Sequence, residues 1–331
     1  KVGGARHERK LRQIVEHYTD IKVMGAVHRT PALEIVERHL GLMPSNESAT
    51  ATGQIESIRS VVQRQVDLNL LQQAAEAAHS PASSFAARDR GFASAFGLRI
   101  GIAMDEAFGF YYAGDLEAFE REGAQLVPFS PITDARLPDV DGIFIGGGFP
   151  ETRMQELETN TSLRHALREY VETGRPLYAE CGGLMYLARS LTWETKSCKM
   201  VGLIAGDAVM YQRPQGRGYV RLKETEQFPW PGLTIPGTEL AAHEFHYSRL
   251  ENLAPNQTYA YRVLRGTGID GEHDGIVYKN MLASYAHMRD VEGYRWVRRF
   301  LDHVRRITSR ADPSARRDVP EVEAGNTLCS K

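Results

Sequence analysis

Between residues 98 and 179, short apolar runs of strand length alternate with amphipathic stretches of helical spacing. The predicted strands are 98–104, 125–129, 142–145 and 176–179, and the predicted helices are 115–122 and 163–173. This alternation predicts an α/β fold with a parallel sheet covered on both faces, because each crossover helix packs on one face of the sheet. Ligands of such sheets bind beyond the carboxyl ends of the strands, so the residues that follow each strand are the first candidates for a functional site.

The sequence before this region predicts a smaller mixed unit. Residues 9–18 and 55–68 have apolar side chains at helical spacing, and 21–27 has the length and composition of a strand. Small, polar and proline residues then predict a linker, and the last residues combine mixed charge with few apolar side chains. We therefore expect a first unit over 1–77, a linker over 78–97, an α/β domain over 98–306 and a disordered tail over 307–331.

Composition excludes several classes of protein. The 331 residues include 40 basic and 42 acidic side chains, a net charge of −2, which disfavours nucleic acid or an anionic membrane as the main partner. The three cysteines have neither disulfide-framework nor metal-ligand spacing, so we expect no metal site. An apolar run long enough to span a membrane and a signal peptide are both absent from the sequence. We expect a cytoplasmic protein.

Cys181 has the sequence context of a nucleophile. It follows a predicted strand, precedes Gly182 and Gly183, and leads into a helical segment. Small neighbours allow a sharp strand-to-helix turn that exposes the side chain, and the start of a helix favours the thiolate. The backbone N–H of Gly182 would then point toward an oxyanion. The alternative is that Cys181 is a small buried apolar residue, as free cysteines usually are, and as we expect for Cys198 and Cys329.

A second glycine-rich segment ends the preceding predicted strand. Gly146, Gly147 and Gly148 allow close approach of the backbone to a ligand and can present N–H groups to a developing negative charge. Taken alone, three glycines are equally typical of a tight turn. Their position one crossover before the Cys181 strand favours a role in the same site.

A thiolate nucleophile needs a partner base, and the chain has 11 histidines. His287 is the first candidate because it lies near the end of a late predicted strand. His243 and His246 are three residues apart, a spacing that does not place them on one face of a strand. A structural role for any single histidine stays open at this point.

From residue 98 to about 306 the chain resembles a class I glutamine amidotransferase domain, in the variant found in the cobyrinic acid a,c-diamide synthase family. The motifs that support this resemblance are AMDEAFGFYY at 103–112, GGGFPE at 146–151, YAECGGLMYL at 178–187, HEFHYS at 243–248 and SYAH at 284–287. Through residues 1–9 and 37–42, the first 77 residues resemble the end of the family's ATP-dependent synthetase domain, an α/β domain of the P-loop, dethiobiotin synthetase-like type.

The resemblance implies roles for particular residues. Cys181 would attack the side-chain amide of glutamine, His287 would manage the proton, and the N–H groups of Gly148 and Gly182 would hold the oxyanion. Ammonia would then reach the synthetase domain. There the family uses ATP and Mg²⁺ to activate corrinoid carboxylates, the a- and c-carboxylates of cobyrinate in cobalamin biosynthesis.

Two departures from the general class I pattern bear on this expectation. Arg289 stands two residues after His287, where most class I amidotransferases have a glutamate; the cobyrinate-type variant also lacks it, so a third member of the triad comes from elsewhere or is absent. We expect modest glutaminase activity of the free domain. The phosphate-binding motif G-x-x-x-x-G-K-[ST] does not occur in the 331 residues, so we expect a truncated chain or the latter part of a longer polypeptide.

The substrate is less constrained by the sequence. A set of polar aromatic residues is suited to a large, flat polycarboxylate ring, although each could equally be part of the core: Tyr111, Tyr112, His243, His246 and Tyr247. Relatives that amidate sirohaem or sirohydrochlorins share the same motifs, and the Arg289-Asp290 pair differs from the usual cobyrinate ending. A non-catalytic scaffold and assembly as a homodimer are the further readings that the sequence leaves open.

Overall fold

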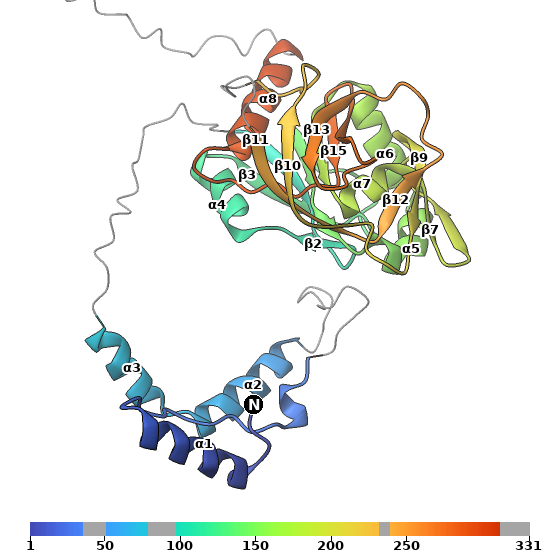
Figure 1. Cartoon of the computed structure of the whole chain (residues 1–331). Helices are drawn as coiled ribbons and strands as arrows, with labels where there is room; N and C mark the ends of the chain where they lie inside the picture. Colours follow the sequence, from blue (N-terminus) through green and yellow to red (C-terminus); the bar gives the residue numbers. More distant parts are fainter. Residues whose placement is uncertain (36–50, 79–96, 232–238, 312–331) are drawn as a thin grey trace, which may run out of the picture. The chain divides into compact units, whose positions relative to one another are not determined.

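The computed structural model describes residues 1–35, 51–78, 97–231 and 239–311. The chain divides into two compact units, Lys1–Gly91 and Phe92–Lys331 (Figure 1). The division falls within the range 78–97 that the sequence predicts as a linker. Most of that predicted linker, residues 79–96, and residues 312–331 of the predicted tail lie outside the described residues.

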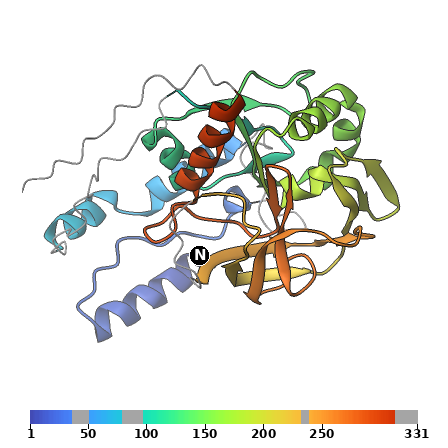
Figure 2. The same ribbon diagram turned by 90° about the horizontal axis from the view of Figure 1, so that it is seen from above.

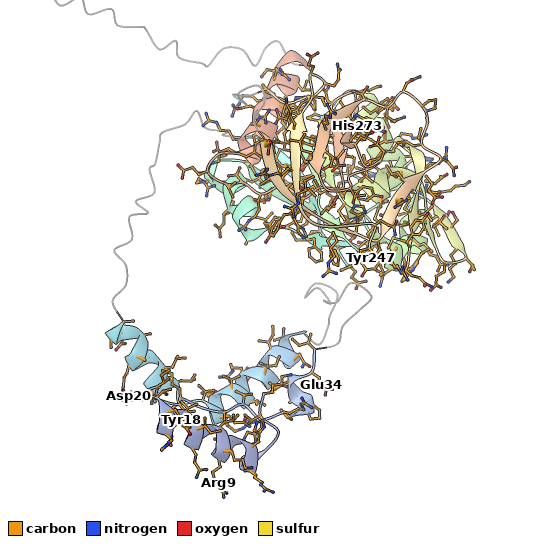
Figure 3. The ribbon with its side chains drawn as sticks, viewed as in Figure 1. Arg9, Tyr18, Asp20, Glu34, Tyr247 and His273 are labelled. Carbon is orange, nitrogen blue, oxygen red and sulfur yellow. The ribbon has the colours of Figure 1, made fainter. Side chains whose placement is uncertain are left out.

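The first unit contains short helices. They are α1 (Ala5–Tyr18), the 3₁₀ helix η1 (Pro31–Leu33), α2 (Ala51–Gln65) and α3 (Leu68–Ala77). The predicted helices are present, but the predicted strand over 21–27 is wrong: only an isolated bridge joins Gly25 to Val66. A short apolar run forms a stable strand only beside other strands, and the described part of this unit offers none. Tyr18, on α1, is 77% exposed (Figure 3).

The second unit is built on a nine-stranded sheet with the order β11-β10-β13-β14-β15-β6-β4-β1-β3. Its parallel half contains β1 (Arg99–Ala103), β3 (Gln125–Phe129), β4 (Gly142–Ile145), β6 (Leu177–Glu180) and β15 (Met281–Ser284). Its antiparallel half contains β10 (Gly216–Glu224), β11 (Glu239–His246), β13 (Tyr259–Arg265) and β14 (His273–Tyr278). The predicted parallel sheet is thus confirmed, and antiparallel strands extend it beyond the prediction.

Smaller sheets and helices surround this sheet. The strands are β7 (Ala188–Trp193), β8 (Lys196–Lys199), β9 (Ile204–Met210) and β12 (Ser248–Glu251), and the pair β2 (Phe108–Phe110) and β5 (Gly147–Gly148). The helices are α4 (Ala113–Arg121), η3 (Pro150–Arg153), α5 (Met154–Thr159), α6 (Thr161–Glu172), α7 (Gly182–Leu187) and α8 (Trp296–Ala311). Helix α8 continues through residues 307–311, where the tail was expected to begin. None of the helices in the described ranges has the length and hydropathy needed to cross a membrane.

The parallel half is buried on both faces, because alternate side chains of each strand enter different cores. Ile143 and Leu177 belong to one core cluster, and Phe144 and Tyr178 belong to the other. In the second cluster the Phe144 and Tyr178 rings stack with centroids 5.4 Å apart, and Trp296 of α8 packs 5.1 Å from Tyr178. Figure 2 shows α8 as the red helix on this unit. Two-sided packing holds the strand ends in fixed positions.

Candidate active site

Three loops meet at one edge of the sheet. Strands β4, β6 and β15 are parallel neighbours, with Ala179 of β6 paired to both Ile145 and Ala283. Their carboxyl ends therefore finish side by side, and the segments that follow them contain Gly148, Cys181 and His287. The structure thus brings together three motifs that lie far apart in the sequence, as the parallel-sheet prediction requires.

Cys181 sits on a strained turn between β6 and α7. Its backbone has φ 48° and ψ −100°, a conformation rarely adopted by residues other than glycine, and its N–H donates to the Ser284 carbonyl at 2.8 Å. The sulfur lies 3.9 Å from the carbonyl oxygen of Phe245 on β11. The residue is 8% exposed. This is the sharp strand-to-helix turn that the small neighbours of Cys181 predict.

His287 contacts a carboxylate through one ring nitrogen and lies near the Cys181 side chain. Its Nδ1 lies 3.2 Å from Oε2 of Glu180, the residue before the cysteine, and the Cys181 side chain is close enough to raise the pKa of the ring. Glu180 is 3% exposed; its Oε1 accepts from the Tyr178 hydroxyl at 2.6 Å and from the Met288 N–H at 2.9 Å. With Nδ1–H donated to Glu180, Nε2 is the ring atom left for the sulfur.

The surroundings of His287 favour its charged form. Burial lowers the pKa of the imidazole, but hydrogen bonds to Cys181 and Glu180 raise it more, to about 10. The ring is therefore protonated at neutral pH. An imidazole beside the sulfur is the kind of partner that a cysteine nucleophile requires.

Glu180 is the residue of this site that sequence reasoning missed. Class I patterns direct attention to the position two residues after the histidine, which is Arg289 here. The available signal is a charged residue that ends the otherwise apolar strand β6 just before the nucleophile. A buried carboxylate there needs a partner, and the structure supplies the His287 ring.

Gly148 and Gly182 approach each other closely, and Gly182 directly follows Cys181 in the chain. A Cβ on Gly182 would lie 2.9 Å from the Gly148 nitrogen, and a Cβ on Gly148 would lie 2.0 Å from the Ala107 carbonyl oxygen. Neither contact is tolerated, so both positions require glycine. Gly182 is the first residue of α7, and its N–H therefore has no acceptor within the helix.

Two of the predicted substrate contacts are engaged in the fold. The Tyr111 hydroxyl donates to the Ala103 carbonyl and accepts from the Gly146 N–H at 3.0 Å. Its burial raises the pKa of the phenol. His246 is 3% exposed, stacks on Tyr285 with centroids 3.8 Å apart, and its Nδ1 is 2.8 Å from the Ser248 carbonyl oxygen. His246 is thus buried in the fold, and Tyr111 is half-buried and fixed by its hydrogen bonds.

The other predicted contacts are more accessible. Tyr112 is 37% exposed, and the Arg289 guanidinium lies 5.2 Å above its ring. His243 exchanges two backbone hydrogen bonds with His287, at 2.7 and 3.2 Å, and their ring centroids are 6.3 Å apart. Tyr247, labelled in Figure 3, is half-buried and packs against Phe245. As predicted, alternation along β11 places His243 and His246 on different faces.

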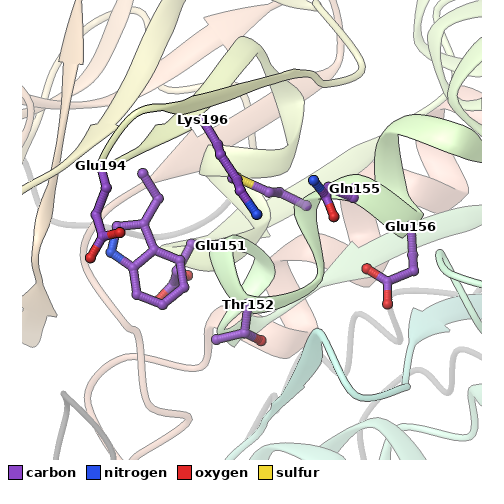
Figure 4. A pocket seen from close by; sticks show the side chains of 8 residues that line it. Glu151, Thr152, Gln155, Glu156, Glu194 and Lys196 are labelled. Atoms are coloured by element: carbon purple, nitrogen blue, oxygen red, sulfur yellow. The ribbon is translucent and has the colours of Figure 1, made fainter.

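A separate pocket of about 220 Å³ lies at η3, α5 and the β7–β8 hairpin (Figure 4). Its lining includes neither Cys181 nor His287. The lining residues are Glu151, Thr152, Met154, Gln155, Glu156, Trp193, Glu194 and Lys196. We assign no ligand to this pocket.

ATP and magnesium, which the resemblance implies, do not fit the residues at hand. Across the described ranges there is no group of three or more His, Cys, Asp or Glu side chains that could hold a metal ion. The sequence also lacks the phosphate-binding motif. We therefore derive no step that passes through ATP or the metal.

Comparison with known proteins agrees with this geometry. The model of the CobB/CobQ-like glutamine amidotransferase domain matches residues 99–290. A cobyrinate a,c-diamide synthase from Magnetococcus marinus is 41% identical over 298 residues, which cover 88% of this chain and 62% of that protein. One from Methanothermobacter thermautotrophicus is 41% identical over 294 residues, 87% of this chain and 62% of that protein.

This chain therefore spans less than two thirds of the length of these relatives. Among solved structures, PurLQS from Thermotoga maritima matches 64% of this chain and 99% of that chain with 15% identity and a TM-score of 0.49, from which we take no argument. The family match covers more than half of the chain and all of the residues assembled around Cys181. The chain belongs to the CobB/CobQ-like glutamine amidotransferase family.

Proposed function

We propose that this chain is the glutamine-hydrolysing part of an ATP- and glutamine-dependent ligase that amidates carboxylates of a tetrapyrrole, namely the a- and c-carboxylates of cobyrinate. The observation behind the proposal is the strained Cys181 beside His287, whose Nδ1 is held by Glu180. The names of the relatives support the choice of cobyrinate as substrate.

In the first step the Cys181 thiolate attacks the side-chain amide carbon of glutamine. A carbon–sulfur bond forms and the carbonyl oxygen becomes an oxyanion. The backbone N–H groups of Gly148 and Gly182, two residues that approach each other closely, are the proposed donors to that oxyanion. One such donor is typically worth about 3 kcal/mol of transition-state stabilisation in acyl transfer.

In the second step the intermediate collapses. His287 gives its Nε2 proton to the departing nitrogen, the carbon–nitrogen bond breaks, and ammonia leaves a thioester on Cys181. Neutral His287 then takes a proton from water, which attacks the thioester and releases glutamate. Glu180 keeps the imidazole in one orientation through both transfers and stabilises its charged form.

Tyr112, His243 and Tyr247 are proposed to line the approach to Cys181, because they are partly exposed and come from segments next to His287 or Phe245. A role in binding glutamine suits these positions better than contact with a tetrapyrrole. The ammonia acceptor, with ATP and Mg²⁺, is proposed to bind in sequence that the relatives have and this chain does not.

The glutaminase proposal is tested by treating the chain with a glutamine-analogue diazoketone and mapping the modified cysteine. Modification of Cys181 supports the proposal, whereas modification of Cys198 alone contradicts the assignment of the nucleophile. The substrate is tested by completing the chain with the amino-terminal segment of the Magnetococcus relative and supplying ATP, Mg²⁺ and glutamine. Conversion of cobyrinate to its diamide supports the proposal, and conversion of sirohaem instead contradicts it.

A further inference from the structure

The segment that bears His287 is held almost entirely by acceptors outside its own strand. Strand β15 ends at Ser284, yet the backbone N–H groups of residues 285–288 and 290 all donate hydrogen bonds. The acceptors are Asp274 for Tyr285 and Ala286, the His243 carbonyl for His287, Glu180 for Met288 and Asp115 for Asp290. Three of these acceptors are buried carboxylates from three different elements.

Asp274 holds the two peptide groups immediately before His287. It lies on β14 in the antiparallel half and is 0% exposed. Its Oδ1 accepts from Gly275 at 2.8 Å and from Tyr285 at 3.0 Å, and its Oδ2 accepts from Ala286 at 2.9 Å. Both carboxylate oxygens therefore contribute to fixing the backbone direction immediately before His287.

Holding a carboxylate at this depth is unfavourable for the fold. Burial raises the pKa of Asp274 to about 6, despite the three N–H donors and the nearby His246. A group whose pKa is raised in this way destabilises the folded state at neutral pH. A gain in stability therefore does not explain why a carboxylate lies at this position. Its hydrogen bonds to the two peptide groups before His287 do explain it.

Asp115 makes the corresponding contact on the other side of the histidine. It lies in the first turn of α4 and is 4% exposed. Its Oδ1 accepts from the Asp290 N–H at 2.8 Å, and its Oδ2 accepts from the Trp296 indole at 3.3 Å. The segment 285–290 is thus fixed at both ends, while Glu180 fixes its middle through Met288 and the His287 ring.

We propose that Asp274 is a positioning residue for His287, with Asp115 as a weaker second one, and that both act by holding the backbone of 285–290 so that the imidazole faces Cys181. The inference rests on the proposed function, because it assigns a purpose to the same cysteine–histidine pair. A displacement of about 1 Å in a catalytic group can lower a rate about 100-fold. Neither carboxylate has to touch glutamine for this effect.

The replacement Asp274→Asn tests the contact with little change in shape. The amide oxygen can still accept from Gly275 and Tyr285, but the amide nitrogen faces the Ala286 N–H, donor against donor. Asp141→Asn is the control. Asp141 is a half-buried carboxylate directly before β4, at the opposite end of that strand from Gly148, and its Oδ2 accepts from the Arg99 N–H at 2.7 Å.

The experiment measures glutamine hydrolysis, diazoketone labelling of Cys181 and the thermal midpoint of the chain and its variants. For Asp274→Asn we expect kcat and the labelling rate to fall about 10- to 100-fold, with KM for glutamine within about twofold and an unchanged or higher thermal midpoint. Asp115→Asn is expected to lower kcat about three- to tenfold, and Asp141→Asn to leave it within about twofold. The ¹⁵N–¹H signals of the His287 ring should shift in Asp274→Asn and not in Asp141→Asn.

Other results overturn the inference. Wild-type kcat in Asp274→Asn, an increase in KM alone, or an equal loss in Asp141→Asn would each do so. If Asp274→Asn does not fold, Asp115→Asn decides, and an unchanged kcat there rejects the proposal. If the unsubstituted chain is not labelled at Cys181, it is the proposed function that fails; the positioning claim is then judged by the ring signals alone, and unshifted signals reject it.

Discussion

The two halves of the nine-stranded sheet contribute to the candidate site in different ways. The parallel half provides Gly148, Glu180 and Cys181 directly at the ends of β4 and β6. The antiparallel half provides the backbone of His243, the carboxylate of Asp274 and the carbonyl of Phe245, which contact the His287 segment or the sulfur. Reacting side chains come from one half, and much of the support of the base comes from the other.

This difference shows how one sheet can place a nucleophile at a ligand-binding edge and also hold its partner histidine in a fixed position. Ends of parallel strands lead into loops that open to ligands, so a nucleophile there is accessible. A histidine in the loop after β15 needs external support, because the ladder between β15 and β6 stops at Ser284. The antiparallel strands supply that support through the backbone of His243 and the carboxylate of Asp274.

Removing the nucleophile is the strongest test of this difference between the two halves of the sheet. Cys181→Ser should lower glutamine hydrolysis at least about 1,000-fold, because the hydroxyl at this position is far less nucleophilic than a thiolate. Cys198→Ser is the control, since burial and the nearby Glu158 raise the pKa of that thiol. Glutamate release measures both. Equal loss in the two variants would contradict the assignment of chemistry to the end of β6.

A methyl group at the end of β4 should have the next largest effect. Gly148→Ala places its Cβ within 2.0 Å of the Ala107 carbonyl oxygen, so the β2–β5 pair has to move. We expect kcat to fall about 100-fold through loss of an oxyanion donor. Gly114→Ala, at a position in α4 where a Cβ meets nothing within 4 Å, should stay at the wild-type rate. Steady-state kinetics measures both variants. An equal loss of kcat in Gly114→Ala would show that the loss in Gly148→Ala is not specific to the oxyanion donor.

Removing the charge next to His287 should have a smaller effect. Glu180→Gln keeps an acceptor for Met288 but presents a donor to Nδ1, which disfavours the orientation with Nε2 toward Cys181. The expected loss in kcat is about 10- to 100-fold, with KM nearly unchanged. A loss confined to KM would mean that Glu180 acts on glutamine binding rather than on the base.

The pH dependence of stability gives the smallest expected effect. Because the pKa of His287 is raised from 6.5 to about 10 in the folded state, the stability it contributes is complete below pH 6.5 and is lost as the pH rises through about 10. Urea unfolding should show the free energy of unfolding falling by on the order of a few kcal/mol between pH 7 and 10. His287→Gln should flatten this fall. An equally steep fall in that variant would assign it to other groups.

Much of the parallel half could be predicted from the sequence, because its signals are local. Strand length, glycine positions and the Cys-Gly-Gly turn act within a few residues, and β3, β4 and the turn at Cys181 agree with the expectation. The strand expected over 21–27 was wrong, because strand formation depends on a neighbour that an apolar run cannot reveal. The antiparallel pairing of β10, β11, β13 and β14 depends on the same kind of distant partner.

The support of His287 could not be predicted for a related reason. Glu180 and His287 lie 107 positions apart, and no spacing rule joins them. Asp274 and Asp115 reveal their role only through backbone N–H groups, which leave no trace in side-chain identity. Tyr111 and His246 show a further difficulty, since the sequence does not reveal that the fold also uses their polar atoms in hydrogen bonds.

The N–H of Cys181 bonds to the carbonyl of Ser284, at the end of a strand that is among the last parts of the domain to be synthesised. Pairing across so long a stretch of chain is slow, since loop closure has to precede it. Until β15 has paired with β6, Cys181 lacks the carbonyl that holds its turn, and His287 is not yet beside it. The cysteine–histidine pair is therefore assembled only when the two ends of the domain meet, and labelling of position 181 during refolding would follow that event.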